Sequence, residues 1–205
     1  AATLEEAGGV VLIASPPQHG MTTTLDTLLQ RHDPYTDSIV TLEDQVSFEM
    51  EGVNHEVLEP GTSTEQITER LGAILRRDPQ VVMLSKLADN QSARVIAGAA
   101  KEVRFYAGVR ANDWYQALMI WLKAVGDMRS GAKGISAIVS QRLVRRLCPT
   151  CRIAYKPDPA TLHKINLPAE RVAQLYKHSG QVMVRNEPQA CPDCMGLGYK
   201  GRVGV

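Results

Sequence analysis

Apolar runs alternate along the first two thirds of the chain with stretches in which apolar positions recur every three or four residues. Short continuous apolar runs are typical of buried strands, and the three-to-four-residue spacing is typical of amphipathic helices. Their alternation predicts βα units, and therefore an α/β fold with a mainly parallel sheet. The predicted strands are 9–14, 38–42, 80–84 and 103–109, and the predicted helices are 22–31, 62–76, 92–100, 113–125 and 134–147.

Two further segments have patterns of their own. Residues 47–58 alternate between polar and apolar around Gly52, which predicts a hairpin. After Cys148 the composition changes, because prolines at 149, 157, 159 and 168 interrupt regular structure and leave room for short helices near 160–165 and 169–178. We therefore predict a core of residues 1–147 and a small C-terminal subdomain of residues 148–205.

Composition excludes several classes of protein. The 205 residues are 44% hydrophobic and 22% charged, with a net charge of +1, as in ordinary globular proteins. This balance gives no electrostatic reason to expect nucleic acid or an anionic membrane surface as a partner. No apolar run approaches the ~20 residues that span a bilayer, and no signal peptide is recognisable. We expect no nucleic-acid partner and no direct membrane insertion.

The cysteines form two C-P-x-C pairs, Cys148 with Cys151 and Cys191 with Cys194. Each pair places two thiolates on one tight turn, and four thiolates satisfy tetrahedral zinc with no position left for water. Two disulfides, or four unrelated buried thiols, are the alternatives, and a chain without a secretory signature disfavours disulfides. The spacing therefore predicts a structural zinc site that holds the proline-rich segment together.

The stretch SPPQHGMTTTL at 15–25 lies between a predicted strand and a predicted helix, where a phosphate-binding loop would lie. The frame G-x-x-x-x-G-K-[ST] points backbone N–H groups at phosphates and adds a lysine ammonium. At its four defined positions this chain has Ser15, Gly20, Met21 and Thr22. The stretch is thus a lost ATP site, a modified one or a coincidence.

Several motifs together resemble the C-terminal ATPase domain of the secretion ATPases that power type II secretion and type IV pilus assembly. The family's loop is similar to GPTGSGKTTTL, its acidic box to TIEDPVE, and a later stretch to LRAILRQDPDIIMVGEIRD. Here these are SPPQHGMTTTL, TLEDQVS at 41–47 and LGAILRRDPQVVMLSKLAD at 71–89. SQRLVRRLCPTC at 140–151, the second CPDC and GYKGRVGV at 198–205 also match. The resemblance covers essentially all residues and implies a RecA-like P-loop NTPase fold with a zinc-binding tetracysteine subdomain.

The resemblance also shows where the loop departs from the family. Ser15 and Gln18 stand where the family has glycines, and we expect their side chains to block a positive φ or a close backbone approach. Pro17 removes one N–H donor. Gly20 and Thr22 are retained.

Two other family motifs are also altered at residues that the family uses for catalysis. Lys86 stands where the family has a glutamate that activates water, and a lysine there would repel Mg²⁺ and cannot act as a base at neutral pH. Arg110 replaces the histidine of a box similar to STLHTND, of which Asn112 persists. Glu43 and Asp44 of the acidic box also persist, and we interpret them, together with Asn112, as caps and surface acids.

Coordinated loss at three boxes predicts a catalytically inactive, secretion-ATPase-like protein with structural zinc and without bound ATP or magnesium. It would be a structural or regulatory component of a bacterial secretion or pilus machine, beside an active paralogue, cytoplasmic and peripheral to the inner membrane. The alternative is slow ATP turnover, with Lys86 or Arg110 supplying the missing charge. A zinc-ribbon nucleic-acid binder is disfavoured because no aromatic platform accompanies the cysteines. The vestigial nucleotide-binding residues would be Ser15, Gln18, Gly20, Thr22, Glu43 and Asp44.

Overall fold

The computed structural model describes residues 8–87, 89–168, 170 and 172–205. The chain divides into two compact units, Ala1–Arg142 and Leu143–Val205, which are described separately. Geometrically the first unit ends at Arg142 rather than Leu147, since the following strand pairs within the second unit. The assignment of a RecA-like core and a zinc-binding subdomain to the two parts stays a prediction.

The first unit is built on a sheet of six parallel strands in the order β3-β2-β4-β5-β1-β6. Four of these strands and the helices expected over 22–31, 62–76, 92–100 and 113–125 confirm the sequence prediction. The strands are β1 (Gly9–Ala14), β2 (Ile39–Glu43), β3 (Asn54–Val57), β4 (Val81–Leu84), β5 (Arg104–Val109) and β6 (Ile135–Ser140). The helices are α2 (Met21–Leu29), α3 (Thr64–Leu75), α4 (Asn90–Ala99), α5 (Trp114–Val125) and α6 (Met128–Gly134).

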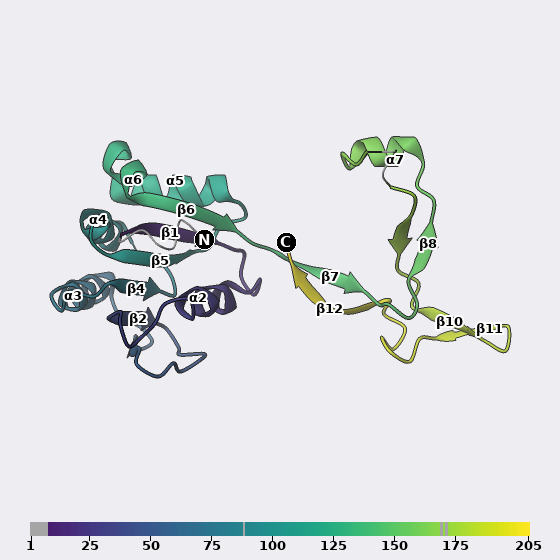
Figure 1. Ribbon diagram of the computed structural model, residues 1–205, viewed down its shortest axis with the longest axis horizontal. Helices are drawn as coiled ribbons and strands as arrows, with labels where there is room; N and C mark the ends of the chain where they lie inside the picture. The colour runs from purple at the N-terminus through teal and green to yellow at the C-terminus, as the bar shows by residue number, and fades with distance from the viewer. Residues whose placement is uncertain (1–7, 88, 169, 171) are drawn as a thin grey trace. The chain divides into compact units, whose positions relative to one another are not determined.

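Helices cover both faces of this sheet (Figure 1). Side chains of α3, α4 and α5 pack with alternate strand residues in the larger core cluster, whereas Leu25 and Leu29 of α2 pack on the opposite face with Ile13 and Tyr106. The four central strands, β1, β2, β4 and β5, are buried along their whole length. Strands buried on two faces have near-continuous apolar sequences, which is why the sequence showed them clearly.

Most helices of this unit begin at a side-chain cap. Ser63 and Gln66 form a capping box at α3, Asp89 accepts from Ser92 N–H at α4 (2.6 Å), and Asp113 accepts from Gln116 N–H at α5 (2.7 Å). Such caps contribute about 0.5–2 kcal/mol each. Helix α2 differs, because it begins after Gly20 with no side-chain cap, so its first N–H groups are not occupied by a capping side chain.

Two sequence predictions are wrong, one within this unit and one that extends from it into the second unit. Residues 134–147 form β6 and β7 (Leu143–Leu147) instead of one helix; their β-branched Ile135, Ile138 and Val139 suit a strand, and pairing with β1 decides the outcome. Residues 47–58 do not form a hairpin. Gly52 does turn the chain at φ 82°, but β3 then pairs in parallel with β2.

In its described residues, the second unit has three antiparallel strand pairs and one short helix. The pairs are β7 with β12 (Tyr199–Gly204), β8 (Ile153–Tyr155) with β9 (Leu175–Lys177), and β10 (Gln181–Val184) with β11 (Glu187–Ala190). Helix α7 (Pro159–Lys164) confirms the helix expected near 160–165. The prediction of a helix over 169–178 is wrong where the strand β9 forms instead, and residues 169 and 171 lie outside the described residues. No helix among the described residues is long and apolar enough to cross a bilayer.

Trp121 of α5 provides a test of the helical layer. It is fully buried, and its indole N–H donates to the Gly131 carbonyl at 3.0 Å. Trp121→Ala should lower the free energy of unfolding by about 3–5 kcal/mol. Trp121→Phe should lower it by about 1–3 kcal/mol, because the buried carbonyl loses its donor. Urea denaturation followed by circular dichroism measures both, with the exposed Trp114→Ala as a control that changes stability by about 0.5 kcal/mol or less.

Candidate functional site

The loop of residues 15–20 follows β1 at the carboxyl edge of the parallel sheet. Ser15 is fully buried, and its N–H donates to the Val109 carbonyl at the end of β5 (3.2 Å). The Gln141 N–H, just after β6, donates to the Ala14 carbonyl at 2.9 Å. The crevice outside the carboxyl ends of the strands is where open α/β sheets bind ligands, so the loop has the position that the sequence predicted.

The loop contains two residues with a positive φ, one of which is not a glycine. Gln18 adopts φ 63° and Gly20 adopts φ 86°, so the expectation that the Gln18 side chain blocks a positive φ is wrong. A left-handed conformation costs a non-glycine residue about 1–2 kcal/mol, which the surrounding fold offsets. The donor set is poorer, however, since Pro16 and Pro17 carry no N–H.

Gln141 closes the loop from the neighbouring strand. Its Nε2–H donates to the His19 carbonyl at 2.7 Å, and its Oε1 accepts from the Thr24 hydroxyl in the first turn of α2. With its backbone N–H bound to Ala14, this residue joins both ends of the loop. The sequence motif containing Gln141 was recognised, but nothing in its pattern identified this bridge.

Met21 directs its side chain at the sheet. It packs against the smaller core cluster, and a Cβ placed on Gly108 would lie 2.5 Å from the Met21 Sδ and 2.3 Å from the Ser85 carbonyl oxygen. The residue at the lysine position therefore covers the ends of β4 and β5 with an apolar side chain.

Lys86 and Asp44 form an ion pair between the ends of β4 and β2. The Lys86 Nζ lies 2.9 Å from the Asp44 Oδ2, and the two side chains are 43% and 51% exposed. The Ser85 hydroxyl accepts from the Asp44 N–H at 3.3 Å. An exposed pair of this kind contributes at most about 1 kcal/mol, but it gives the Lys86 charge a partner.

Glu43 is buried, so its interpretation as a cap or surface acid is wrong. Its Oε1 lies 3.1 Å from the Nδ1 of His55 on β3. The His55 Nε2 accepts from the Met50 N–H at 3.2 Å, so the proton of a neutral ring is on Nδ1, facing Glu43. Burial raises the pKa of Asp26 on α2, and the Glu43 carboxylate raises that pKa further.

Arg110 and Asn112 follow β5 at the same edge. Arg110 is exposed and belongs to no ion pair among the residues that the structure describes. The Asn112 carbonyl accepts from the Nη2 (2.7 Å) and Nε (3.2 Å) of Arg142. Neither residue is directed by a hydrogen bond to the loop.

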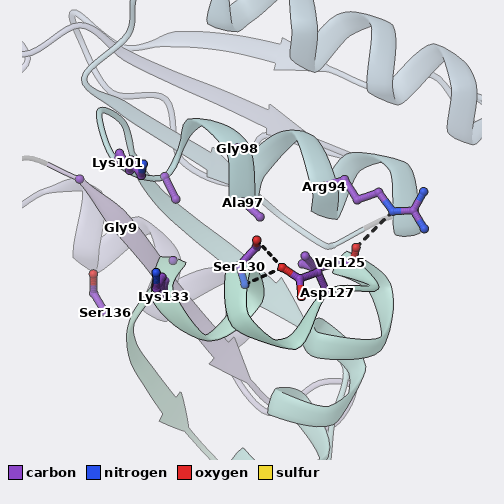
Figure 2. Close-up of a pocket in the computed structure, with 13 residues that line it drawn as sticks. Gly9, Arg94, Ala97, Gly98, Lys101, Val125, Asp127, Ser130, Lys133 and Ser136 are labelled. Carbon is purple, nitrogen blue, oxygen red and sulfur yellow. Dashed lines mark hydrogen bonds between the residues drawn. The ribbon is translucent and has the colours of Figure 1, made fainter.

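A cavity of about 840 Å³ lies at the opposite, amino end of β1, between α4 and α6 (Figure 2). Its charged lining residues are Arg94, Lys101, Lys133 and Asp127. The Asp127 carboxylate accepts from the N–H and hydroxyl of Ser130, which lowers its pKa. Because it lies away from the carboxyl ends of the strands, this cavity is not the nucleotide candidate. A smaller cavity of about 260 Å³ lies beside Asp44 and Lys86.

The four cysteines converge in the second unit, as their spacing predicted. Their Sγ atoms all lie within 4.8 Å of one another and are buried. Cys148 and Cys191 sulfurs are 3.9 Å apart and Cys151 and Cys194 sulfurs 3.6 Å apart, and no disulfide joins them. Tetrahedral zinc with Zn–S bonds of about 2.3 Å spaces its sulfurs about 3.8 Å apart. The cluster therefore fits zinc.

Backbone groups hold the cluster and tune its thiols. The Gly198 N–H donates to the Cys194 Sγ at 3.1 Å. Burial opposes ionisation of Cys148, but hydrogen bonds from the Cys151 and Thr150 N–H groups lower its pKa to about 7. Burial raises the pKa of Cys151 to about 12. Among the described residues, no other group of three or more His, Cys, Asp or Glu is close enough to hold a metal.

The entire chain, residues 1–205, matches the family model described as type II/IV secretion system protein. The chain belongs to this family. It is 30% identical over 200 residues to the type IV pilus assembly ATPase PilB of Thermus thermophilus and 30% identical over 200 residues to a putative type II secretion system protein E of Escherichia coli. Both matches cover 96% of this chain but only 21% and 38% of those relatives.

Solved structures of an ATPase and of a pilus retraction motor share the fold of part of this chain. The ATPase DotB of Legionella pneumophila superposes with a TM-score of 0.60 at 16% identity, over 70% of this chain and 43% of that one. The pilus retraction motor PilT with bound ADP gives a TM-score of 0.56 at 20% identity, over 72% of this chain and 46% of that one. At these identities the likeness concerns the fold alone.

Removing the Gln141 side chain tests the bridge across the loop. Gln141→Ala should speed amide hydrogen exchange over residues 19–24 and lower the free energy of unfolding by about 1–3 kcal/mol, since the His19 carbonyl and Thr24 hydroxyl lose a partner. Gln45→Ala, in an exposed loop, is the control and should leave both unchanged. Unaltered exchange in Gln141→Ala would show that the loop is held by other groups.

Proposed function

We propose that this chain is a catalytically inactive secretion-ATPase domain that acts as a structural or regulatory part of a type II secretion or type IV pilus machine. The observation that carries the proposal is the arrangement at three degenerate positions. Met21 packs on the sheet, Lys86 is paired with Asp44, and Arg110 is exposed without an ion pair among the described residues.

Phosphoryl transfer depends almost entirely on positioning and on charge stabilisation, which these groups do not supply. An ammonium on the terminal phosphates is absent because Met21 is neutral. A lysine is protonated at neutral pH, so Lys86 cannot accept a proton from water. Its ammonium group is held by the Asp44 carboxylate. Glu43 is engaged by His55 inside the protein. ATP and magnesium therefore have no complete site among Ser15, Gln18, Gly20, Thr22, Glu43 and Asp44.

The proposed cellular setting follows from family membership. The Thermus thermophilus relative is named a type IV pilus assembly ATPase, and an inactive member would work beside an active paralogue. Its place would then be at the cytoplasmic face of the bacterial inner membrane.

One observation favours a second candidate, a slow ATP-binding motor subunit. Gln18 and Gly20 both adopt a positive φ, a conformation that glycines at these positions would allow, and Thr22 stays exposed at the start of α2. In that case Lys86 or Arg110 would have to reach the phosphates, and Lys86 would first leave Asp44.

Nucleotide calorimetry separates the two candidates. With magnesium and ATP up to about 1 mM we expect no resolvable binding, because each lost charge-assisted bond to phosphate removes about 1.5–3 kcal/mol. Met21→Lys alone should not restore turnover, since Lys86 and the substituted glycine positions remain. Binding of Mg-ATP near micromolar affinity, or turnover that Lys86→Ala abolishes, would overturn inactivity and establish the motor.

We also propose that Cys148, Cys151, Cys191 and Cys194 hold one structural zinc ion. A bound zinc would supply no catalytic chemistry here, because four sulfur ligands leave no position for water. Its role would be to join the two C-P-x-C turns of the second unit, where few other large side chains are buried. The sulfur spacings of 3.6 and 3.9 Å support this proposal.

Elemental analysis of the purified chain tests the zinc site. We expect one equivalent of zinc per chain and its loss in Cys194→Ser, with loosening of residues 143–205 and an intact parallel sheet. Met195→Ser is the matched control, since Met195 is adjacent and 87% exposed. Metal-free protein, or disulfides in place of thiols, would contradict the assignment without bearing on nucleotide binding.

A further inference from the structure

The cavity at the amino end of β1 carries an excess of positive charge. The basic residues that line it are Arg94, Lys101 and Lys133, and Asp127 is the acid among its described lining residues. The Asp127 carboxylate accepts from the N–H and hydroxyl of Ser130 at the start of α6, so its hydrogen-bonding capacity is partly used within the chain. A concave surface with this balance of charge attracts an anionic ligand.

Two of these cations have side chains that can turn to a ligand. Lys101 follows the C-terminal end of α4, Lys133 lies in the last turn of α6, and both are exposed. Neither belongs to an ion pair within the part of the chain that the structure describes. The Lys133 charge lowers the pKa of Asp127, although less than the hydrogen bonds to that carboxylate do. Figure 2 shows both lysines at the end of the cavity that contains Gly9, and Arg94 at the other end.

A buried arginine adds positive charge behind the wall of this cavity. Arg104, at the start of β5, is only 2% exposed. Its Nη1 lies 3.2 Å from the position that a Cβ on Gly9 would take. Buried charges are screened much less than exposed ones, so the Arg104 guanidinium raises the positive potential at the end of the cavity where the two lysines lie.

An irregularity in the sheet brings a hydroxyl group to the same end. The pairing of β1 with β6 shifts in register after Val10, and Ser136 is the β6 residue that the shift leaves out of the pairing. Such bulges re-aim a side chain and are frequent beside functional sites. Ser136 lines the cavity, and a Cβ on Gly9 would overlap its hydroxyl. The glycine therefore allows the Ser136 hydroxyl to lie in the wall.

The size and lining of the cavity limit the kind of anion that it can hold. Its volume of about 840 Å³ is within the range of about 300–1,000 Å³ that is usual for small-molecule sites. No aromatic side chain is among its described lining residues, so a nucleotide base would have no ring on which to stack. The Ser130 and Ser136 hydroxyls can instead donate to and accept from the hydroxyl groups of a sugar. Most other lining residues are small: Gly8, Gly9, Ala97, Gly98, Ala100 and Gly134.

We propose that this cavity binds a small sugar that carries a phosphate group at each end. One phosphate would lie between Lys101 and Lys133, since each ammonium group offers three donors. The other would lie beside Arg94, whose Nε donates to the Val125 carbonyl at 3.2 Å and so fixes the guanidinium at the end of α5. Charge-assisted hydrogen bonds of this kind are about twice as strong as neutral ones.

The ligand would connect parts of the first unit that are distant in the sequence. It would contact α4, α6 and the first residues of β1, and a ligand that binds only the folded state stabilises it. The loop of residues 15–20 follows the other end of β1. Binding in the cavity is therefore independent of whether the loop binds ATP.

Titration of the 205-residue chain with fructose 1,6-bisphosphate, followed by amide chemical shifts in NMR spectra, tests the site. We expect a Kd below about 1 mM, with shifts concentrated at residues 8–9, 94–101 and 127–136. Inorganic phosphate should bind at least about tenfold more weakly, because it engages one end of the cavity only. The proposal is overturned by absence of binding up to about 10 mM, by shifts at residues 15–24 instead, or by inorganic phosphate that binds equally well.

Neutral variants identify the cations that bind the ligand. Lys101→Gln/Lys133→Gln should weaken binding of the bisphosphate at least about tenfold, because charge-assisted bonds to phosphate are lost. Lys156→Gln/Lys164→Gln removes the same charge at exposed positions of the second unit and should bind like the unaltered chain. Circular dichroism checks that both variants are folded. Unchanged binding in the first variant, or an equal loss in the second, would show that the cavity is not the site.

Discussion

Burial of both faces of the parallel sheet is the constraint on which the rest of the first unit depends. The four central strands are buried along their whole length, so their residues are mainly apolar, and a buried polar one such as Glu43 has its partner inside the protein. Ser15, Asp44 and Arg110 follow directly on such strands, and Lys86 follows β4 after Ser85. Asp44, Lys86 and Arg110 are exposed, so substitution there changes the chemistry at this edge of the sheet with little effect on its packing.

The strands that are buried on both sides were predictable from sequence, because no other arrangement suits such continuous apolar runs. The edge strands were not. β6 and β7 are half-exposed, their apolar residues also fit a helical spacing, and only pairing with β1 and β12 selects the extended form. The same holds for β3, whose parallel pairing with β2 no local turn signal specifies.

In the candidate site, the spacing of residues along the sequence was more informative than the environment of a side chain. Two C-P-x-C pairs predicted the convergence of four sulfurs, since each pair already fixes half of the cluster. By contrast, the burial of Glu43 depends on His55, twelve residues away on another strand. The left-handed Gln18 likewise depends on a fold that holds the loop from outside. Contacts between distant segments are not encoded in a motif.

The bridge made by Gln141 has a thermodynamic consequence. A nucleotide that binds only the folded state adds stability in proportion to RT ln(1 + [L]/Kd), so an ordinary P-loop domain becomes firmer as nucleotide rises. An amide that belongs to the chain makes its hydrogen bonds to the loop at every nucleotide concentration. The stabilisation that Gln141 gives to the loop is therefore constant, and it does not change with the concentration of ATP or ADP in the cell.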